Sequence, residues 1–358
     1  MSTSPSSPIE TEGLASSPVA PIRYFDILPL ELVTEIHGWV DEEDFDRVRE
    51  KTLVSLCLTA KRFLQEARSL LLGDITILRT RPGSRSLAKL VETVDDNKLA
   101  LVRRLHLGWS NLTNSASEDL TELADAVVNL SELWIDFAEE CLLPSRGANL
   151  TILSLYSLYL NNVDLLSFPH LTHLHLSDVH RSGDLVLQVP SLKHLTTASG
   201  HFRLQFLDQL PPRLASCSYD ASSRVSLPAS ILESPSIFRC YKIWDKWTLP
   251  AKHVHVLRLR CPNRLTDCIE SFKNSDPSVE AVILPLPKKG SQTDLWAPLL
   301  DTCSRRQIQV VWATAKHDRS LFDDAAHWVF REAERRHLGN REGGGGQGRE
   351  FGSHRHVG

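Results

Sequence analysis

Apolar residues in the first fifth of the chain recur at steps of three and four, which places them on one face of a helix. The first of these stripes consists of Leu28, Leu32, Val33, Ile36, Trp39 and Val40. Shorter stripes begin at Leu53 and Phe63, and an acidic stretch over residues 41–50 separates them from the first. The pattern predicts three short helices, which together are near the lower size for an independent core.

From about residue 100 the pattern changes to short apolar strings of the form L-x-x-L-x-L. The clearest strings begin at Val102, Leu130, Leu150, Leu171 and Leu192, and weaker ones begin at Leu214, Ile237, Val254 and Val279. From Leu130 to Leu214 the starting positions are 20 to 22 residues apart. This recurrence is typical of stacked repeats that share one leucine core, so we expect a strand at each string. One register stays open, because residues 155–160 fit the template as well as the string before them.

The two ends of the chain have compositions typical of disorder. Residues 1–21 combine serines with prolines, and residues 339–358 contain four consecutive glycines. Between them we expect two domains, a helical module over residues 22–78 and stacked repeats over residues 79–338. Residues 320–338 are amphipathic and are expected to form a helix that caps the last repeat.

Side chains alternate between the two faces of a strand, so the leucines of each string point into the core and their neighbours point to the other face. That second face is predicted to carry Arg104, His106, Glu132, Trp134, Ile152, Ser154, His173, His175, His194, Thr196, Arg239, Tyr241 and Arg258. Among these, we expect the residues that bind a target protein to be Trp134, His173, His175, His194 and Tyr241.

Composition narrows the classes of function. The 358 residues are 42% hydrophobic and 23% charged with a net charge of −4, so no basic excess indicates binding to nucleic acid or to an anionic membrane. The longest apolar runs fall short of the roughly 20 residues of a membrane helix, and the N-terminus lacks the apolar core of a signal peptide. We therefore expect a protein of the cytoplasm or nucleus. The seven cysteines are odd in number and contain no C-x-x-C, which favours buried reduced thiols.

Several segments of the helical module resemble the F-box family. They are Leu28-Pro29-Leu30-Glu31-Leu32-Val33, Leu53-Val54-Ser55-Leu56-Cys57-Leu58, Lys61-Arg62-Phe63 and Leu70-Leu71-Leu72-Gly73-Asp74-Ile75-Thr76-Ile77, the last resembling the way many fungal F-box chains enter their repeats. F-box proteins bind a Skp-family adaptor, join a cullin-based ubiquitin ligase through it, and select a target protein with their C-terminal repeats. The resemblance implies adaptor contacts at Leu28, Pro29, Leu32, Ile36, Leu53, Val54 and Leu56. Alternatively, these residues form only the module's own core.

The strings resemble leucine-rich repeats, although Ser177 and Asp178 follow Leu176 where that family usually has Asn or Cys. The expected fold class is α+β, with an N-terminal three-helix F-box module followed by an irregular leucine-rich-repeat-like α/β solenoid. The expected function is that of a non-catalytic substrate receptor of a ubiquitin ligase. A repeat scaffold that does not promote degradation and an enzyme with a site on the concave face are the alternatives.

Candidate chemistry on the repeats is sparse. His173, His175 and His194 fall on neighbouring predicted strands, and three imidazoles can hold zinc. No acid accompanies them in the same positions, and histidine is also an ordinary recognition residue. The motifs G-x-S-x-G and G-x-x-x-x-G-K-[ST] are absent from the sequence. We expect no catalytic residue, no metal and no cofactor, while the identity of the target protein stays open.

Overall fold

The computed structural model of the chain describes a defined set of residues, and every structural statement below concerns them. They are residues 51–56, 67, 69–78, 99–109, 127–137, 149–160, 163, 165–220, 224–243, 254–259, 279–286, 293–313 and 324–342. The chain divides into two compact units, Met1–Leu70 and Leu71–Gly358, and each is described by itself.

In the first unit, residues 51–56 are helical. Leu53 is fully buried there, while its neighbour Val54 is 48% exposed. The predicted first helix, around Leu28 to Ile36, lies outside the described residues.

The second unit contains one large sheet, called the main sheet, in which eleven strands are all parallel. In spatial order these strands are β1 (Asp74–Leu78), β2 (Arg104–Trp109), β3 (Glu132–Phe137), β4 (Ile152–Tyr156), β6 (His173–Ser177), β8 (His194–Ala198), β10 (Ser216–Asp220), β11 (Phe238–Ile243), β12 (Val256–Leu259), β13 (Ala281–Pro285) and β14 (Gln309–Ala313). Strands were predicted at each of the five clearest strings, and β2, β3, β4, β6 and β8 confirm them.

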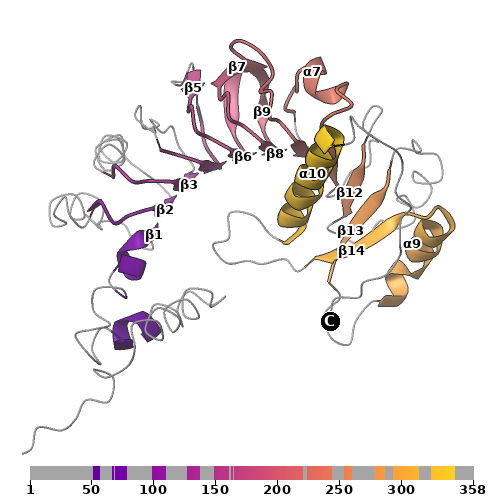
Figure 1. The fold of residues 1–358 in the computed structure, drawn as a ribbon, viewed down its shortest axis with the longest axis horizontal. Coiled ribbons are helices and arrows are strands. Elements are labelled where there is room, and N and C mark those ends of the chain that lie inside the picture. Colours follow the sequence, from indigo (N-terminus) through magenta and orange to yellow (C-terminus); the bar gives the residue numbers. More distant parts are fainter. Residues whose placement is uncertain are drawn as a thin grey trace, which may run out of the picture. The chain divides into compact units, whose positions relative to one another are not determined.

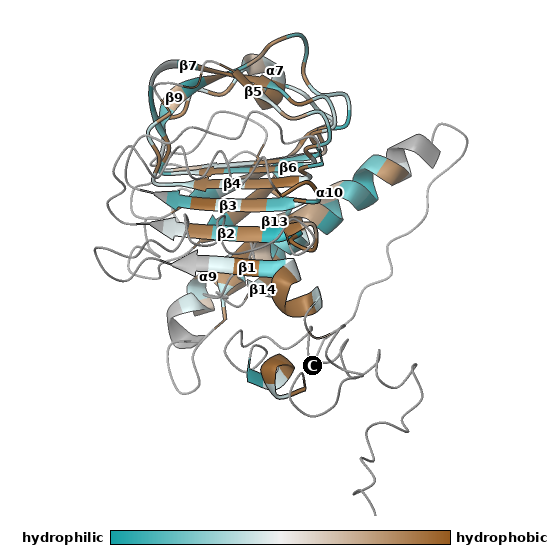
Figure 2. Cartoon of the chain, turned by 90° about the vertical axis from the view of Figure 1, so that its left-hand side faces the viewer, coloured by the Kyte–Doolittle hydropathy of each residue, from teal (hydrophilic) through white to brown (hydrophobic). Residues whose placement is uncertain are grey.

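A second sheet of three parallel strands covers part of one face of the main sheet. Its strands are β5 (Leu165–Ser167), β7 (His180–Gln188) and β9 (His201–Phe206). Leu166, Leu187 and Leu204 of the second sheet belong to the same buried cluster as Leu174 and Leu195 of the main sheet. Figures 1 and 2 show this second sheet as a separate layer beside β4 and β6. The leucine core therefore lies between two β layers.

Two of the described helices lie on opposite faces of the main sheet. Helix α9 (Thr293–Arg305) packs Trp296 and Leu299 on the leucine face, against a cluster that includes Leu257. Helix α10 (Asp324–Glu342) packs against the other face, where Val329 joins a cluster that includes Val256. Leu257 and Val256 are adjacent in strand β12, so their side chains point in opposite directions.

A third described helix, α7 (Ala229–Leu232), is a single turn that buries Ile231. Among the described residues no helix is both long and apolar enough to cross a membrane.

The predicted fold class is wrong. Instead of a three-helix module followed by a leucine-rich-repeat-like α/β solenoid, the described residues form mostly one eleven-stranded parallel sheet with few helices. The connections after β4, β6 and β8 contain strands of the second sheet, because buried residues such as Leu185 and Leu187, or Phe202 and Leu204, alternate with more exposed ones at a period of two. A helix requires a period near 3.6, which these connections lack.

The predicted C-terminal cap also requires correction. Helix α10 does not close the end of a repeat stack, but lies across a face of the main sheet and contacts strands as early in the chain as β6 and β8. Its last residues, Gly339 to Glu342, belong to the segment predicted as a flexible tail. The predicted tail over residues 1–21 lies outside the described residues.

The shared core predicts a large effect for Leu174→Ala. Leu174 is 1% exposed, so removing its side chain loses buried methyl groups and leaves a cavity. We expect the free energy of unfolding to fall by about 2–5 kcal/mol, measured by urea titration with circular dichroism. Leu338→Ala, at a position that is 59% exposed on α10, is the matched control and should change stability by less than about 0.5 kcal/mol. Equal losses for the two variants would contradict this placement of the core.

A candidate recognition face on the main sheet

The strand register aligns polar and aromatic residues on the face of the main sheet opposite the leucines. One cross-strand row consists of Thr76, His106, Trp134, Ser154, His175 and Thr196. A row on one side of it consists of Asp74, Arg104, Glu132, Ile152, His173 and His194, and a row on the other side contains Gly108, Asp136, Tyr156 and Ser177. The predicted surface residues of β2 to β8 are therefore on one face, as expected from alternation.

Four rings on this face form a continuous stack across four strands, called here the ring ladder. His106 stacks on Trp134 with 4.2 Å between ring centroids, Trp134 lies 5.1 Å from Tyr156, and Tyr156 stacks on His175 at 4.8 Å. All four side chains are partly exposed. Offset and stacked rings attract one another beyond the area that they bury, so the ladder is a preformed surface with few rotamers to lose on binding.

Tyr156 was missed in the sequence because its string ends one residue earlier, at Leu155. The signal was nevertheless present, since Ile152, Ser154 and Tyr156 alternate and must share a face. Its ring is the link between Trp134 and His175, which are otherwise separated by strand β4.

Two buried polar groups on this face, one of them in the ladder itself, have no hydrogen-bond partner among the described residues. Within the described part of the chain, neither the Trp134 indole N–H nor the Ser154 hydroxyl has a hydrogen-bond partner, and both atoms are buried. Trp134 and Ser154 face each other across the paired strands β3 and β4. An unsatisfied buried polar group costs free energy, and a target protein on this face does not reach these two atoms because both are buried.

Carboxylates flank Trp134 on both sides along strand β3. Burial raises the pKa of Glu132, while the charge of Arg104 opposes that rise. Burial also raises the pKa of Asp136, and the charge of Asp178 raises it further. Both carboxyl groups hold their protons more readily than free ones, because the site is partly desolvated and its positive charge is sparse.

Helix α10 covers the part of this face that holds His173 and His194. The Phe330 ring centroid lies 5.1 Å from that of His173 and 4.4 Å from that of His194. His194 is 1% exposed, and its Nδ1 is 2.8 Å from the Ser216 hydroxyl oxygen. Both were predicted to bind the target, but His194 is buried and His173 is partly buried against α10.

The same burial controls the protonation of the two imidazoles. Loss of solvent lowers the pKa of His173 to about 3, with a further lowering from neighbouring His194. Burial likewise lowers the pKa of His194 to about 3, with a smaller contribution from Lys193. The two rings are therefore neutral near pH 7 and behave as packing surfaces for Phe330.

Tyr241 does not lie on this face, and its predicted role as an exposed binding residue is wrong. It is 4% exposed, pairs in register with Tyr219 and packs edge-on against that ring in the leucine-side core. Arg239 is on the same inner side, 2% exposed, and donates hydrogen bonds to the carbonyl oxygens of Ile231 and Ser234. The L-x-x-L-x-L string was aligned to start at Ile237, which differs by one residue from the observed register. A shift of one residue exchanges the two faces of a strand, so Tyr241 was assigned to the wrong face.

The described part of the chain contains no group of three metal-ligating side chains. His173 and His194 contact each other with 4.7 Å between ring centroids, whereas His175 stacks on Tyr156. Among the described residues, Cys217, Cys240 and Cys303 are buried and form no disulfide. Burial raises the pKa of Cys217 to about 12 and that of Cys303 to about 11, so neither is a thiolate near pH 7.

The residues expected to contact an adaptor fall into two groups. Leu28, Pro29, Leu32 and Ile36 lie outside the described residues. Of the others, Leu53 is buried, Leu56 is partly buried and Val54 is exposed. Among the described members of the set, Val54 has the most exposed side chain.

Comparison of the chain with protein-family models, with curated proteins and with solved structures gives no match.

The buried imidazoles predict a pH dependence of stability. The unfolded chain binds protons on His173 and His194 near pH 6.5, whereas the folded protein does so near pH 3. As the pH falls through this window the unfolded state holds more protons, so the free energy of unfolding falls, by up to about 1.4 kcal/mol per pH unit for each imidazole. We expect His194→Gln to show a shallower slope than the wild type between pH 6.5 and 4 in urea titrations. Identical slopes would contradict the burial of His194.

Proposed function

We propose that this chain is the substrate-recognition subunit of a Skp-cullin-F-box ubiquitin ligase, acting in the cytoplasm or nucleus. In this proposal, the segment that resembles an F-box binds a Skp-family adaptor, and the main sheet holds a target protein. The chain itself performs no catalysis, because transfer of ubiquitin belongs to the other subunits of such a ligase.

The ring ladder is the observation that carries the recognition half of the proposal. His106, Trp134, Tyr156 and His175 present adjoining, partly exposed edges on one face of a parallel sheet, where backbone hydrogen bonds fix their spacing. Aromatic side chains held rigidly in this way are the usual anchors of protein interfaces.

The adaptor half of the proposal rests on the sequence. The stripe from Leu28 to Val40 is wide for so small a module, and a helix that docks through such a stripe uses residues three and four apart.

Charging the predicted adaptor surface should abolish adaptor binding. We expect Leu32→Lys, and separately Leu28→Ala combined with Pro29→Ala, to eliminate co-precipitation of a Skp-family adaptor, because an unpaired lysine would lose solvation without compensation. Glu31→Ala, on the polar side of the same predicted helix, is the control and should bind normally. Equal adaptor recovery by all of these proteins, with circular dichroism showing them folded, would refute the F-box assignment.

Target binding should depend on the ring ladder. We expect Trp134→Ala and Tyr156→Ala each to weaken target recovery about tenfold or more, because each removes a central ring of the stack. The readout is quantitative mass spectrometry of proteins captured by the full chain with cullin activity blocked. Tyr159→Ala is the matched control, since Tyr159 is 45% exposed and stacks on His180 outside the ladder. Unchanged target capture by both ladder variants would show that the target binds elsewhere on the chain. This result would not bear on adaptor binding.

A further inference from the structure

The second sheet ends in an incomplete hydrogen-bond ladder at its β9 edge. On one side of β9, the Leu207 N–H donates to the Leu187 carbonyl at 2.9 Å. The backbone N–H and C=O groups of odd-numbered residues therefore point toward β7. On the other side, the Leu204 N–H donates to the Ser226 carbonyl, and the Ser226 N–H donates to the Phe202 carbonyl, both at 2.9 Å. The Arg224 N–H donates to the Gly200 carbonyl one step earlier, so residues 224–226 run beside β9 as a short fourth segment with Ser226 as its bridge.

Pro228 prevents the next step of this ladder. By the same two-residue repeat, residue 228 would donate to the Leu204 carbonyl and accept from the Phe206 N–H. Proline has no N–H, and its own carbonyl accepts instead from Ile231 and Leu232 at the start of α7. Among the described residues, neither the Leu204 carbonyl nor the Phe206 N–H has a backbone partner on this side.

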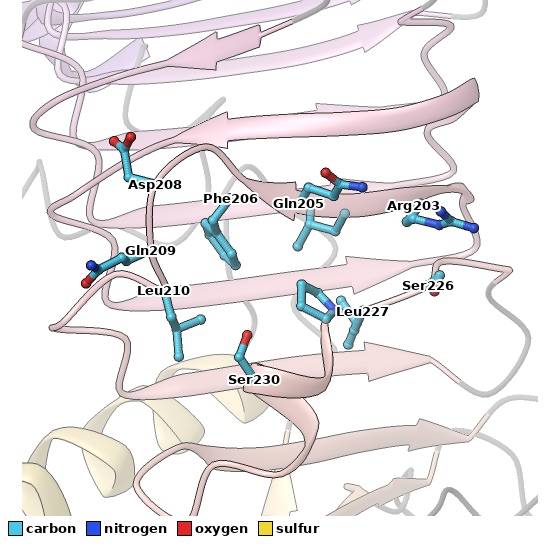
Figure 3. A pocket seen from close by; sticks show the side chains of 11 residues that line it. Arg203, Gln205, Phe206, Asp208, Gln209, Leu210, Ser226, Leu227 and Ser230 are labelled. Carbon is cyan, nitrogen blue, oxygen red and sulfur yellow. The ribbon is translucent and has the colours of Figure 1, made fainter.

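A cavity of about 390 Å³ occupies the place where the missing strand would run. Figure 3 shows Gln205 and Phe206 on one side of it and Leu227 and Ser230 on the other. Phe206, Leu210 and Leu227 are partly buried against the main core and supply an apolar lining. The volume falls within the roughly 300–1,000 Å³ of typical ligand pockets.

The polar rim of the cavity is held in place by the neighbouring strand. The Gln205 side-chain amide donates to the Asp184 carboxylate at 2.7 Å, and the Arg203 guanidinium lies 3.7 Å from the same carboxylate group. These contacts connect β9 to β7 at the surface. The β9 edge therefore does not need to reorganise before it binds a ligand.

We propose that this edge binds an extended peptide segment of a partner protein by strand addition. The first extended residue of the peptide would occupy the bridging position opposite Gln205, because Ser226 already occupies the one opposite Arg203. Its N–H would donate to the Leu204 carbonyl, and its carbonyl would accept from the Phe206 N–H, repeating the bonds that Ser226 makes one step earlier. An apolar side chain of the peptide would enter the lining formed by Phe206, Leu210 and Leu227.

A strand explains the geometry better than a small polar ligand does. The Leu204 carbonyl and the Phe206 N–H, which lack a backbone partner among the described residues, lie two residues apart on one strand edge. A single bridging residue satisfies this spacing in a parallel pair. This site is independent of the proposed ubiquitin-ligase function. The second sheet lies on the leucine side of the main sheet, whereas the ring ladder and α10 lie on the other side.

The test uses the full chain and a synthetic probe, the acetylated and amidated tripeptide Val-Thr-Val, whose first residue is the bridging one. Amide exchange measured by NMR reports directly on the Phe206 N–H. We expect saturating peptide to slow exchange of this amide at least tenfold. The same peptide with an N-methyl group on the amide nitrogen of its first valine cannot donate to the Leu204 carbonyl, and should bind at least tenfold more weakly.

A substitution in the protein tests the same bond from the other side. Pro228→Ala restores an N–H that competes for the Leu204 carbonyl, so it should weaken peptide binding severalfold while circular dichroism remains unchanged. Pro190→Ala, at an exposed proline outside the cavity, is the control and should bind as the wild type does. No slowing of Phe206 exchange at millimolar peptide, or equal binding by the N-methylated peptide or by Pro228→Ala, would overturn the proposal.

Discussion

Parallel pairing in a constant register is the constraint on which the second unit depends. Each strand of the main sheet must present its leucines to the same side as its neighbours, because a shift of one residue would turn them toward water. Leu105, Leu133, Leu153, Leu174 and Leu195 follow one another across five strands in this way. The same alignment forces the residues between the leucines into rows on the opposite face.

The two faces are then used differently along the sheet. On the leucine side, the second sheet covers the strands around β6 and β8, and α9 covers the later ones. On the other side, α10 covers the later strands with small residues such as Ala325 and Ala333, and reaches the earlier strands through Phe330. The ring ladder begins where these contacts end, with His175 in the same strand as His173. The candidate recognition face is therefore bounded by α10 on one side.

The sequence predicted the strands and faces well wherever one face of the sheet is less covered than the other. In β6, buried Leu174 and Leu176 alternate with partly exposed histidines, so the period of two is visible. In β11, Phe238 and Arg239 are consecutive and both buried, because α10 and the core cover both faces. The alternation disappears there, and the position of Tyr241 could not be read. The path of α10 could not be predicted either, since it depends on contacts between residues far apart in the chain.

The register also determined what could be found at the candidate site. Trp134 and His175 were identified because they flank the middle leucine of regular strings. Tyr156 lies just beyond its string and completes the ladder only through ring contacts in three dimensions. The β9 edge was beyond sequence reasoning, because an open edge depends on which residue a neighbouring segment brings opposite it. At Pro228 that segment brings a residue without an N–H.

The late position of α10 in the chain has a consequence for synthesis on the ribosome. Lys193 is paired with Glu334, 141 residues further along, and the apolar face formed by Phe238, Val256 and Ala281 packs against the same helix. The strands emerge first, and domains begin to fold while the chain is still growing. Until the helix has left the exit tunnel, the nascent sheet carries a bare hydrophobic surface over its last strands. During this interval the apolar surface over the last strands is open to aggregation, and a chaperone that covered it would prevent this.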